Sequence, residues 1–352
     1  DTSDPCGAWA ELATIGLPPV RTSAATVFDP VNDRMVIYSG GNVSTSDTYA
    51  LSFAGTPTWI LLSPGGVIPP ARRDAAAIYD PVRQRMIVFG GMLYSDGTNL
   101  NSVWALSLSG TSTWTQLIPA GTPPKGRKDH QAVYDPVRDR MIVFGGRIDG
   151  FPNDTLLNDV WALSLSGTPT WSQLTPIGIP PSQRADFGAI YDPVRDRMLI
   201  FGGWVGYDSG PPYPSRNDTW ALSLAGTPAW TQLAATGTLP SRRQLTSAVY
   251  DPVRDRMVVF GGTTDSPFQR LMDLHGLSLS GTPLWRELPA TTPPPPLSGC
   301  SFFYDPGRDR FGIFAGQAAG GQDQNTTYVI HHDGFVLNVA LNPPAPAGSV
   351  TR

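Results

Sequence analysis

The sequence predicts an all-β fold: a six-bladed β-propeller of four-stranded antiparallel blades. The main observation is that the stretch Tyr-Asp-Pro-Val-Arg-Asp-Arg-Met-Ile-Val-Phe-Gly-Gly, residues 134–146, recurs in six versions. By subtraction, its shared aspartates lie 51, 55, 57, 59 and 54 residues apart: Asp29, Asp80, Asp135, Asp192, Asp251 and Asp305. A period near 50 residues, made of short strands, is typical of a propeller. The content of 37 Gly and 36 Pro also indicates many turns.

One repeat shows how each blade is built. We expect its four strands, from the channel outward, at residues 129–134, 140–144, 160–165 and 170–174. Asp135 followed by Pro136 is the preferred start of a type I turn, and the apolar run that follows it predicts a strand buried on both faces. By the same pattern, the blades start near residues 23, 74, 129, 186, 245 and 299.

The sixth repeat lacks its outermost strand. The other five each end in a strand opened by Trp, but no such strand follows residues 327–331. The segment Ala8-Trp9-Ala-Glu-Leu12 has that pattern at the other end of the chain. We therefore expect residues 8–12 to complete blade six, which removes an open sheet edge and joins the two ends of a single domain, residues 1–334.

Residues 335–352 do not fit a seventh unit. Phe335–Leu341 reads as a strand, and a Pro-rich tail follows it. One interpretation is that this strand opens a further small β module, like those in large secreted bacterial proteins. The other is that it adds to blade six and competes with residues 8–12 for the same place. The sequence leaves both open.

The repeat resembles the kelch family over about 330 residues. The resemblance is carried by Gly-Gly after an apolar strand, by Asn158-Asp-Val-Trp161, and by Trp171 ten residues later. The extracellular bacterial versions carry the same Asp-Pro-Val-Arg-Asp-Arg run. What the resemblance implies is a partner-binding propeller, with enzymes a minority of the family. A copper radical site needs two Tyr, two His and a cross-linked Cys. The chain has only Cys6 and Cys300, and of its four histidines only His331 and His332 are neighbours, on a predicted strand where their side chains point to opposite faces.

Composition excludes several classes of partner. The net charge of −4 gives no general attraction to nucleic acid. No run of 18 apolar residues is present, so we expect no membrane insertion. Two cysteines are too few for a disulfide scaffold or a zinc cluster. In an ideal blade Cys6 and Cys300 lie too far apart to be bridged. We expect no cofactor; the remaining candidate, calcium, would use Asp149, Asn153 and Asp154.

The two faces of the propeller differ in how much their loops vary. The turns between strands one and two and between strands three and four share one face, and they are short and nearly identical. The other face, here called the loop face, holds loops of different length and content. Variable loops on a rigid scaffold are where binding is usually placed. We expect a glycan or a protein as the partner there.

Two sets of charged residues are predicted on the loop face. An arginine stands seven residues before the strand-one aromatic in five blades: Arg21, Arg72, Arg127, Arg184 and Arg243. These could bind acidic ligands in bidentate fashion, or they could pair with loop groups and connect the blades. An aspartate follows two residues later in blades two to four only: Asp74, Asp129 and Asp186. Because these aspartates break the symmetry, they are the stronger candidates for a binding site.

Aromatic residues in the loops after strand two could add to such a site. They are Tyr94, Phe151, Trp204, Tyr207, Tyr213 and Phe268. Aromatic rings beside Asp and Arg suit sugar or peptide recognition by stacking and hydrogen bonding, although long loops also pack on themselves. Catalysis is the alternative role: Asp129 beside His130 could act in acid–base chemistry. An enzyme is the less favoured class, because no nucleophile motif is present.

The sequence therefore predicts a secreted binding or structural module, located outside the cell or on its surface, with a role in adhesion or surface assembly. The alternative is an enzyme on acidic sugars at the channel mouth. Self-association through the two chain ends is a further expectation. Neither the ligand nor the oligomeric state can be read from the sequence.

Overall fold

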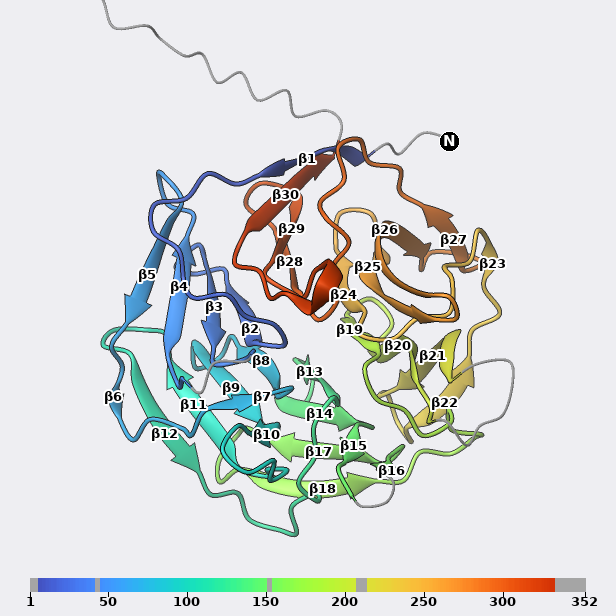
Figure 1. The fold of residues 1–352 in the computed structure, drawn as a ribbon. Helices are drawn as coiled ribbons and strands as arrows, with labels where there is room; N and C mark the ends of the chain where they lie inside the picture. The colour runs from blue at the N-terminus through green and yellow to red at the C-terminus, as the bar shows by residue number, and fades with distance from the viewer. Residues whose placement is uncertain (1–5, 42–44, 151–153, 207–213, 333–352) are drawn as a thin grey trace, which may run out of the picture.

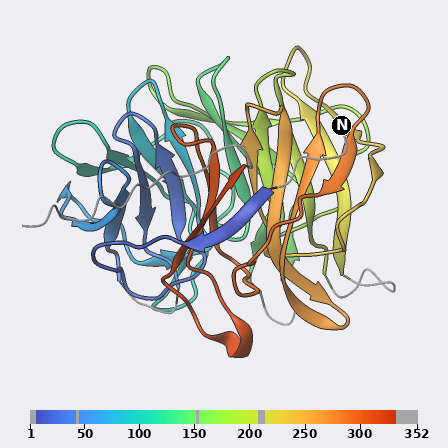
Figure 2. The same ribbon diagram turned by 90° about the horizontal axis from the view of Figure 1, so that it is seen from above.

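The computed structural model describes residues 6–41, 45–150, 154–206 and 214–332. Six main antiparallel sheets stand around a central channel, so the predicted six-bladed all-β propeller is confirmed (Figure 1). The only helical element in the described part is the short 3-10 helix η2 (Ala319–Gly321). It projects on the same face as the hairpin of β25 and β26, whose bounds are given below (Figure 2).

The strands of each blade run from the channel to the rim. Blade one holds β2 (Ala25–Asp29), β3 (Arg34–Tyr38), β4 (Thr48–Ser52) and β5 (Thr58–Leu62). Blade two holds β8 (Ala76–Asp80), β9 (Arg85–Phe89), β11 (Val103–Ser107) and β12 (Thr113–Leu117). Blade three holds β13 (Gln131–Asp135), β14 (Arg140–Phe144), β17 (Val160–Ser164) and β18 (Thr170–Leu174).

The second half of the ring has the same order. Blade four holds β19 (Gly188–Asp192), β20 (Arg197–Trp204), β21 (Ser215–Ser223) and β22 (Ala229–Gln232). Blade five holds β24 (Ser247–Asp251), β25 (Arg256–Asp265), β26 (Phe268–Ser278) and β27 (Leu284–Glu287). Blade six holds β28 (Ser301–Asp305), β29 (Arg310–Phe314), β30 (Thr327–His332) and β1 (Cys6–Glu11).

Short two-residue strands accompany the blades. On the loop face these are β7 (Arg72–Arg73) with β10 (Met92–Leu93), and β15 (Arg147–Ile148) with β16 (Thr155–Leu156). On the rim, β6 (Gly65–Gly66) lies beside β12 and β23 (Thr236–Gly237) lies beside β27. The described residues include no helix long and apolar enough to cross a membrane.

The predicted turn chemistry is present in the structure. The Asp135 side chain accepts hydrogen bonds from the backbone N–H groups of Val137 (3.1 Å) and Arg138 (3.2 Å), which fixes the turn between β13 and β14. The apolar residues of β14 from Met141 to Phe144 are fully buried, as expected for a strand packed between two blades. The strand before the turn begins at Gln131, two residues later than predicted.

The first strand of the chain lies in the last blade. β1 pairs antiparallel with β30, with Trp9 opposite Ile330 and Glu11 opposite Tyr328 (Figure 1). Trp9 is only 4% exposed and its ring lies 5.5 Å from that of Phe260. The predicted segment 8–12 therefore occupies the outermost place of blade six. The predicted strand within residues 335–352 lies outside the described residues.

Ion pairs connect the blades on the face of the short turns. In five of the six gaps between blades, the first arginine of one turn bonds through its side chain in bidentate fashion to an aspartate of the next blade. These pairs are Arg83–Asp139, Arg138–Asp196, Arg195–Asp255, Arg254–Asp309 and Arg308–Asp33. Between blades one and two both partners are replaced together, by the uncharged Asn32 and Gln84.

Candidate functional site at the channel mouth

A closed ring of backbone hydrogen bonds defines the channel mouth on the loop face. One residue of each blade, just before strand one, donates its N–H to the carbonyl oxygen of the equivalent residue of the preceding blade, at 2.8–3.3 Å. The six residues have φ between 51° and 60°. They are Ser23, Asp74, Asp129, Asp186, Leu245 and Gly299. The left-handed conformation turns each chain sharply into the channel, and Asp tolerates it better than most residues.

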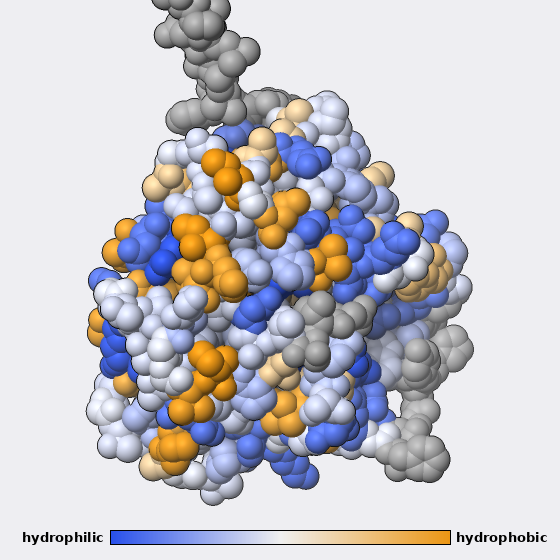
Figure 3. All heavy atoms as spheres, turned by 60° about the vertical axis from the view of Figure 1, so that its left-hand side comes forward, coloured by the Kyte–Doolittle hydropathy of each residue, from blue (hydrophilic) through white to orange (hydrophobic). Residues whose placement is uncertain are grey.

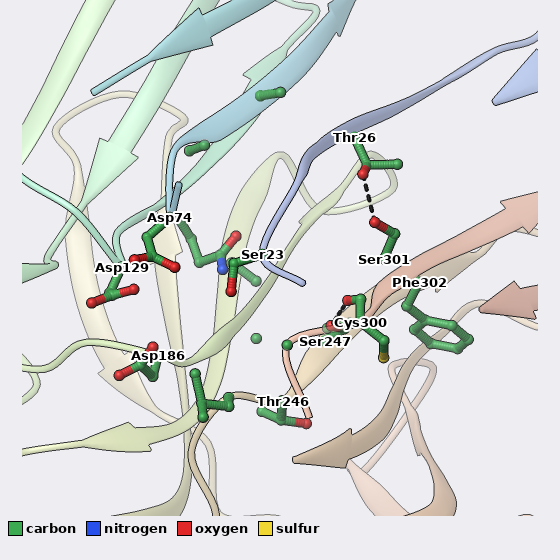
Figure 4. Close-up of a pocket in the computed structure, with 18 of the residues that line it drawn as sticks. Ser23, Thr26, Asp74, Asp129, Asp186, Thr246, Ser247, Cys300, Ser301 and Phe302 are labelled. Carbon is green, nitrogen blue, oxygen red and sulfur yellow. Dashed lines mark hydrogen bonds between the residues drawn. The ribbon is translucent and has the colours of Figure 1, made fainter. Parts of the chain in front are cut away.

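Three neighbouring members of this ring are acidic. Asp74, Asp129 and Asp186 come from blades two, three and four and lie on one side of the mouth, away from Cys300 and Phe302 (Figure 4). The opposite side has only Ser23, Leu245 and Gly299 at the equivalent places. The acidic residues named here, Asp74, Asp129 and Asp186, are called the aspartate triad below.

A cavity of about 270 Å³ lies at this mouth. Its wall has hydroxyl groups from Ser23, Thr246 and Ser247 and an apolar part that includes Phe302. Cys300, a buried free thiol, also lines it. Burial raises the pKa of Cys300 to about 12, so the sulfur stays protonated and unreactive near neutral pH.

Asp129 has a shorter ion pair than Asp74. Its Oδ2 accepts a hydrogen bond from Arg147 Nε at 2.7 Å. The same guanidinium bonds to Asp154 Oδ2 at 2.8 Å and lies over the ring of Trp204, 5.4 Å from its centroid. Trp204 itself is 9% exposed. Arg147 is thus held on three sides, and its charge balances that of Asp129.

The other two carboxylates are poorly balanced. Burial, with the nearby charge of Asp129 as the second cause, raises the pKa of Asp74 to about 7. The same two causes raise the pKa of Asp186 well above its ordinary value. Arg73 Nε is 3.6 Å from Asp74 Oδ2, too long for a strong hydrogen bond. Full ionisation of the triad is therefore unfavourable, and a positive charge bound beside it would stabilise the ionised form.

The arginines predicted at the mouth are buried instead. Arg127 has no exposed surface; it bonds to both carboxylate oxygens of Asp159, at 2.6 and 2.8 Å, and to the Gly145 carbonyl oxygen at 3.0 Å. Arg72 bonds to Gly90 and Ser102. The remaining pairs repeat the Arg127 arrangement: Arg21–Asp47, Arg184–Asp218 and Arg243–Asp273. This placement favours the interpretation in which the arginines connect loops and strands, so we leave them out of the proposed site.

The sequence reasoning missed the partners of these arginines. Asp47, Asp159, Asp218 and Asp273 each stand two residues before the aromatic or histidine ring of strand three. That constant offset in the sequence could have identified these aspartates as the partners of the arginines. In blade two Ser102 occupies the same place, so the shared pattern is a small polar acceptor beside each buried guanidinium.

Of the predicted aromatic residues, the structure describes Tyr94, Trp204 and Phe268. Tyr94 is 37% exposed on a loop after β10, whereas Trp204 ends β20 beside Arg147. Phe151, Tyr207 and Tyr213 lie outside the described residues. Asp149 bonds to Lys128 Nζ at 2.9 Å and Asp154 to Arg147, so both carboxylates of the calcium candidate have protein cations as partners. The third, Asn153, is outside the described residues.

The catalytic alternative has an unsuitable histidine. His130 is 2% exposed, and its ring packs edge-on against Phe89 at 5.2 Å. Burial, together with the charge of Arg127, lowers the pKa of His130 to about 3. Among the described residues, neither ring nitrogen has a hydrogen-bond partner. The imidazole is therefore a neutral packing group, and Asp129 is engaged by Arg147 rather than by His130.

Fold and sequence together define a class, the kelch-type propellers. The chain belongs to the kelch-repeat family: the family model of the KLHDC2/KLHL20/DRC7 Kelch-repeats domain matches residues 6–203 and 191–342. Propellers of this family typically bind proteins, and this supports a binding or structural role for the chain.

Similar proteins are found among eukaryotic proteins and solved structures. Host cell factor 2 of Homo sapiens is 27% identical over 270 residues, 72% of this chain and 32% of the relative. Host cell factor 1 of Homo sapiens is 27% identical, covering 66% of this chain and 11% of the relative. Putative adagio-like protein 2 of Oryza sativa subsp. japonica is 28% identical, covering 82% and 46%. The chain thus spans less than half of these relatives. The solved structure of YjhT has a TM-score of 0.70 at 16% identity, covering 91% of this chain and 97% of that one, which shows a shared fold.

Proposed function

We propose that this chain is a binding module that holds a partner protein on its loop face by a positively charged side chain placed at the channel mouth. The observation that carries the proposal is the aspartate triad, three neighbouring carboxylates at one side of an otherwise uncharged ring. A guanidinium or ammonium group there would stabilise the charged forms of Asp74 and Asp186, whose pKa values are raised by burial and by the nearby charge of Asp129.

The cavity suits the rest of such a side chain. Its volume of about 270 Å³ exceeds what a lysine or arginine stem needs, and Ala75, Ala132 and Ala189 provide apolar wall. The stem of a long cationic side chain packs well on apolar surface while its charged end makes polar contacts. An acidic sugar would instead meet three carboxylates, and the arginines it would need are buried and paired. We therefore do not propose the acidic-sugar enzyme.

We place this binding outside the cell or on its surface, as part of adhesion or surface assembly. The support is the resemblance of the Asp-Pro-Val-Arg-Asp-Arg repeats to extracellular bacterial versions. A glycan partner stays a prediction; among glycans, the triad favours those with amino groups. Fractionation of the source cells with an antibody against the propeller checks the location.

A peptide selection tests the proposed function. The propeller is used to select from a displayed library of random peptides, and the selected peptides are measured by calorimetry against the wild type and the triple variant D74N/D129N/D186N. We expect selected peptides to share an arginine or lysine, and the triple variant to bind at least about tenfold more weakly. The control is Val137→Ser on the opposite face, which should bind like the wild type. Peptides without basic residues, or binding unchanged in the triple variant, would refute the proposal.

A further inference from the structure

The outermost strand of blade one differs from its five counterparts. In every blade, the two residues that follow the tryptophan of the outermost strand are exposed on the rim. In blade one they are Ile60 and Leu61. In the other blades, at least one of the two is polar: Thr115-Gln116, Ser172-Gln173, Thr231-Gln232, Arg286-Glu287 and Ala10-Glu11. The repeats act as an internal reference, and blade one alone departs from it.

Both apolar side chains are open to solvent. Ile60 is 46% exposed and Leu61 56% exposed. Beside them lie Ile15 and Leu17, at 59% and 61%, in the segment that runs along β5. Figure 3 shows apolar side chains in several groups on the side of the propeller that carries β5 and β6. Ile15, Leu17, Ile60 and Leu61 are called the blade-one edge below.

The backbone of β5 also offers hydrogen bonds at this edge. The Trp59 N–H points outward, because it donates to the Ile15 carbonyl oxygen at 2.9 Å. Groups on one side of a strand repeat every second residue, so the N–H and C=O of Leu61 point outward too. No backbone hydrogen bond to another segment reaches Leu61 within the described part of the chain. An exposed apolar edge with free backbone groups is a template for pairing with another strand.

We infer that the blade-one edge binds the same edge of a second copy of this chain. Antiparallel pairing of two β5 strands about a two-fold axis places each Leu61 opposite the other, where their backbone groups satisfy one another. No charged residue lies between Asp47 and Arg72. Pairing two copies therefore brings no like charges together, and a charged partner would find no complementary group. The five other edges carry the polar side chains that usually prevent such contacts.

This dimer leaves the channel mouth free. β5 lies on the rim, whereas the aspartate triad lies at the centre of the loop face (Figure 1). The inference is thus independent of the proposed function. If both hold, the dimer presents two binding sites at once, which raises the avidity for a repeated partner.

Sedimentation velocity over a range of protein concentrations tests the inference. The wild type should show a concentration-dependent shift to twice the monomer mass. Ile60→Thr with Leu61→Gln, which copies the sequence of blade two, should raise the dimer dissociation constant at least about 100-fold, because it removes two apolar groups per copy from the contact. The matched control, Thr115→Ser with Gln116→Ala, changes the same places in blade two and should dimerise like the wild type.

A cross-link locates the contact directly. In a Cys6→Ser background, Leu61→Cys should form a covalent dimer on mild oxidation, because opposite residues of an antiparallel pair lie about 5.5 Å apart between Cα atoms. Gln116→Cys in the same background should not. A wild type that stays monomeric up to about 1 mM overturns the inference. So does a dimer that the blade-one double substitution leaves intact.

Discussion

Arg308 and Asp33 lie 275 residues apart in the chain and form a bidentate ion pair, at 2.8 and 2.7 Å, between blade six and blade one. Arg308 also donates to the Phe53 carbonyl oxygen at 2.8 Å. The same pair occurs in four other gaps between blades. At this gap alone the pair joins the last repeat to the first. Its contribution to stability therefore reports on the closure of the ring.

A double-mutant cycle on Arg308 and Asp33 should give a coupling free energy of about 0.5–1 kcal/mol. The value is modest because the two side chains are 31% and 37% exposed. The hydrogen bond from Arg308 lowers the pKa of Asp33. The coupling should therefore be present at neutral pH and lost as pH falls below the ordinary range of Asp. Urea unfolding of the four variants at pH 7 and pH 3 measures it; a zero coupling at pH 7 would show that the pair does not hold this gap.

Trp9→Ala should lower the free energy of unfolding by about 3–5 kcal/mol, the usual cost of removing a buried Trp side chain. Trp9 is 4% exposed against Phe260, and its strand pairs with β30 on one side. On the other side the Trp9 N–H donates to the Thr291 carbonyl oxygen at 3.1 Å, and the Trp9 carbonyl oxygen accepts from the Thr292 hydroxyl at 2.7 Å. The control is Ala10→Ser on the exposed side of the same strand, which should change the stability little. Urea denaturation decides between them: wild-type stability in the Trp9 variant would mean that β1 does not close the ring.

Asp74→Asn should stabilise the protein at pH 8 and have little effect at pH 5. The folded-state pKa of Asp74 is raised to about 7, mainly by burial. Between about pH 4 and pH 7 the folded state then binds more protons than the unfolded state, so wild-type stability falls as pH rises through this window. Asn removes that loss, a gain on the order of 2 kcal/mol at pH 8. The check is the free energy of unfolding of both proteins, measured by urea denaturation from pH 5 to pH 8. A difference between the two proteins that stays constant over this range would contradict the raised pKa.

The repeat pattern made the fold predictable from the sequence. Asp135, Pro136 and the buried run after them specify a turn and a strand locally, and six copies leave few architectures open. Contacts between blades were harder to predict. Arg138 bonds to Asp135 of its own turn at 3.0 Å, but it also bonds to Asp196 of the next blade at 2.6 Å. A sequence does not show which turns become neighbours around a ring.

The candidate site was predicted in part. The strand order placed Asp74, Asp129 and Asp186 on the loop face, and they were favoured as a binding site because they break the symmetry of the repeats. The strand was expected to include Asp129, whereas the structure holds it at a φ of 55°, outside β13. The arginines could not be assigned, since burial decides between a ligand contact and a structural one. Arg147, which engages Asp129, was missed because its role depends on how the loop after β14 folds back.

The most direct measurement of the central claim is amide hydrogen exchange with and without a selected basic peptide. The account predicts slower exchange on the loop face, at residues 73–77, 128–132 and 185–189, and no change in the turns at residues 135–139 and 192–196. In D74N/D129N/D186N the protection should disappear. Protection confined to the short turns, or retained in full by the triple variant, would contradict binding at the channel mouth.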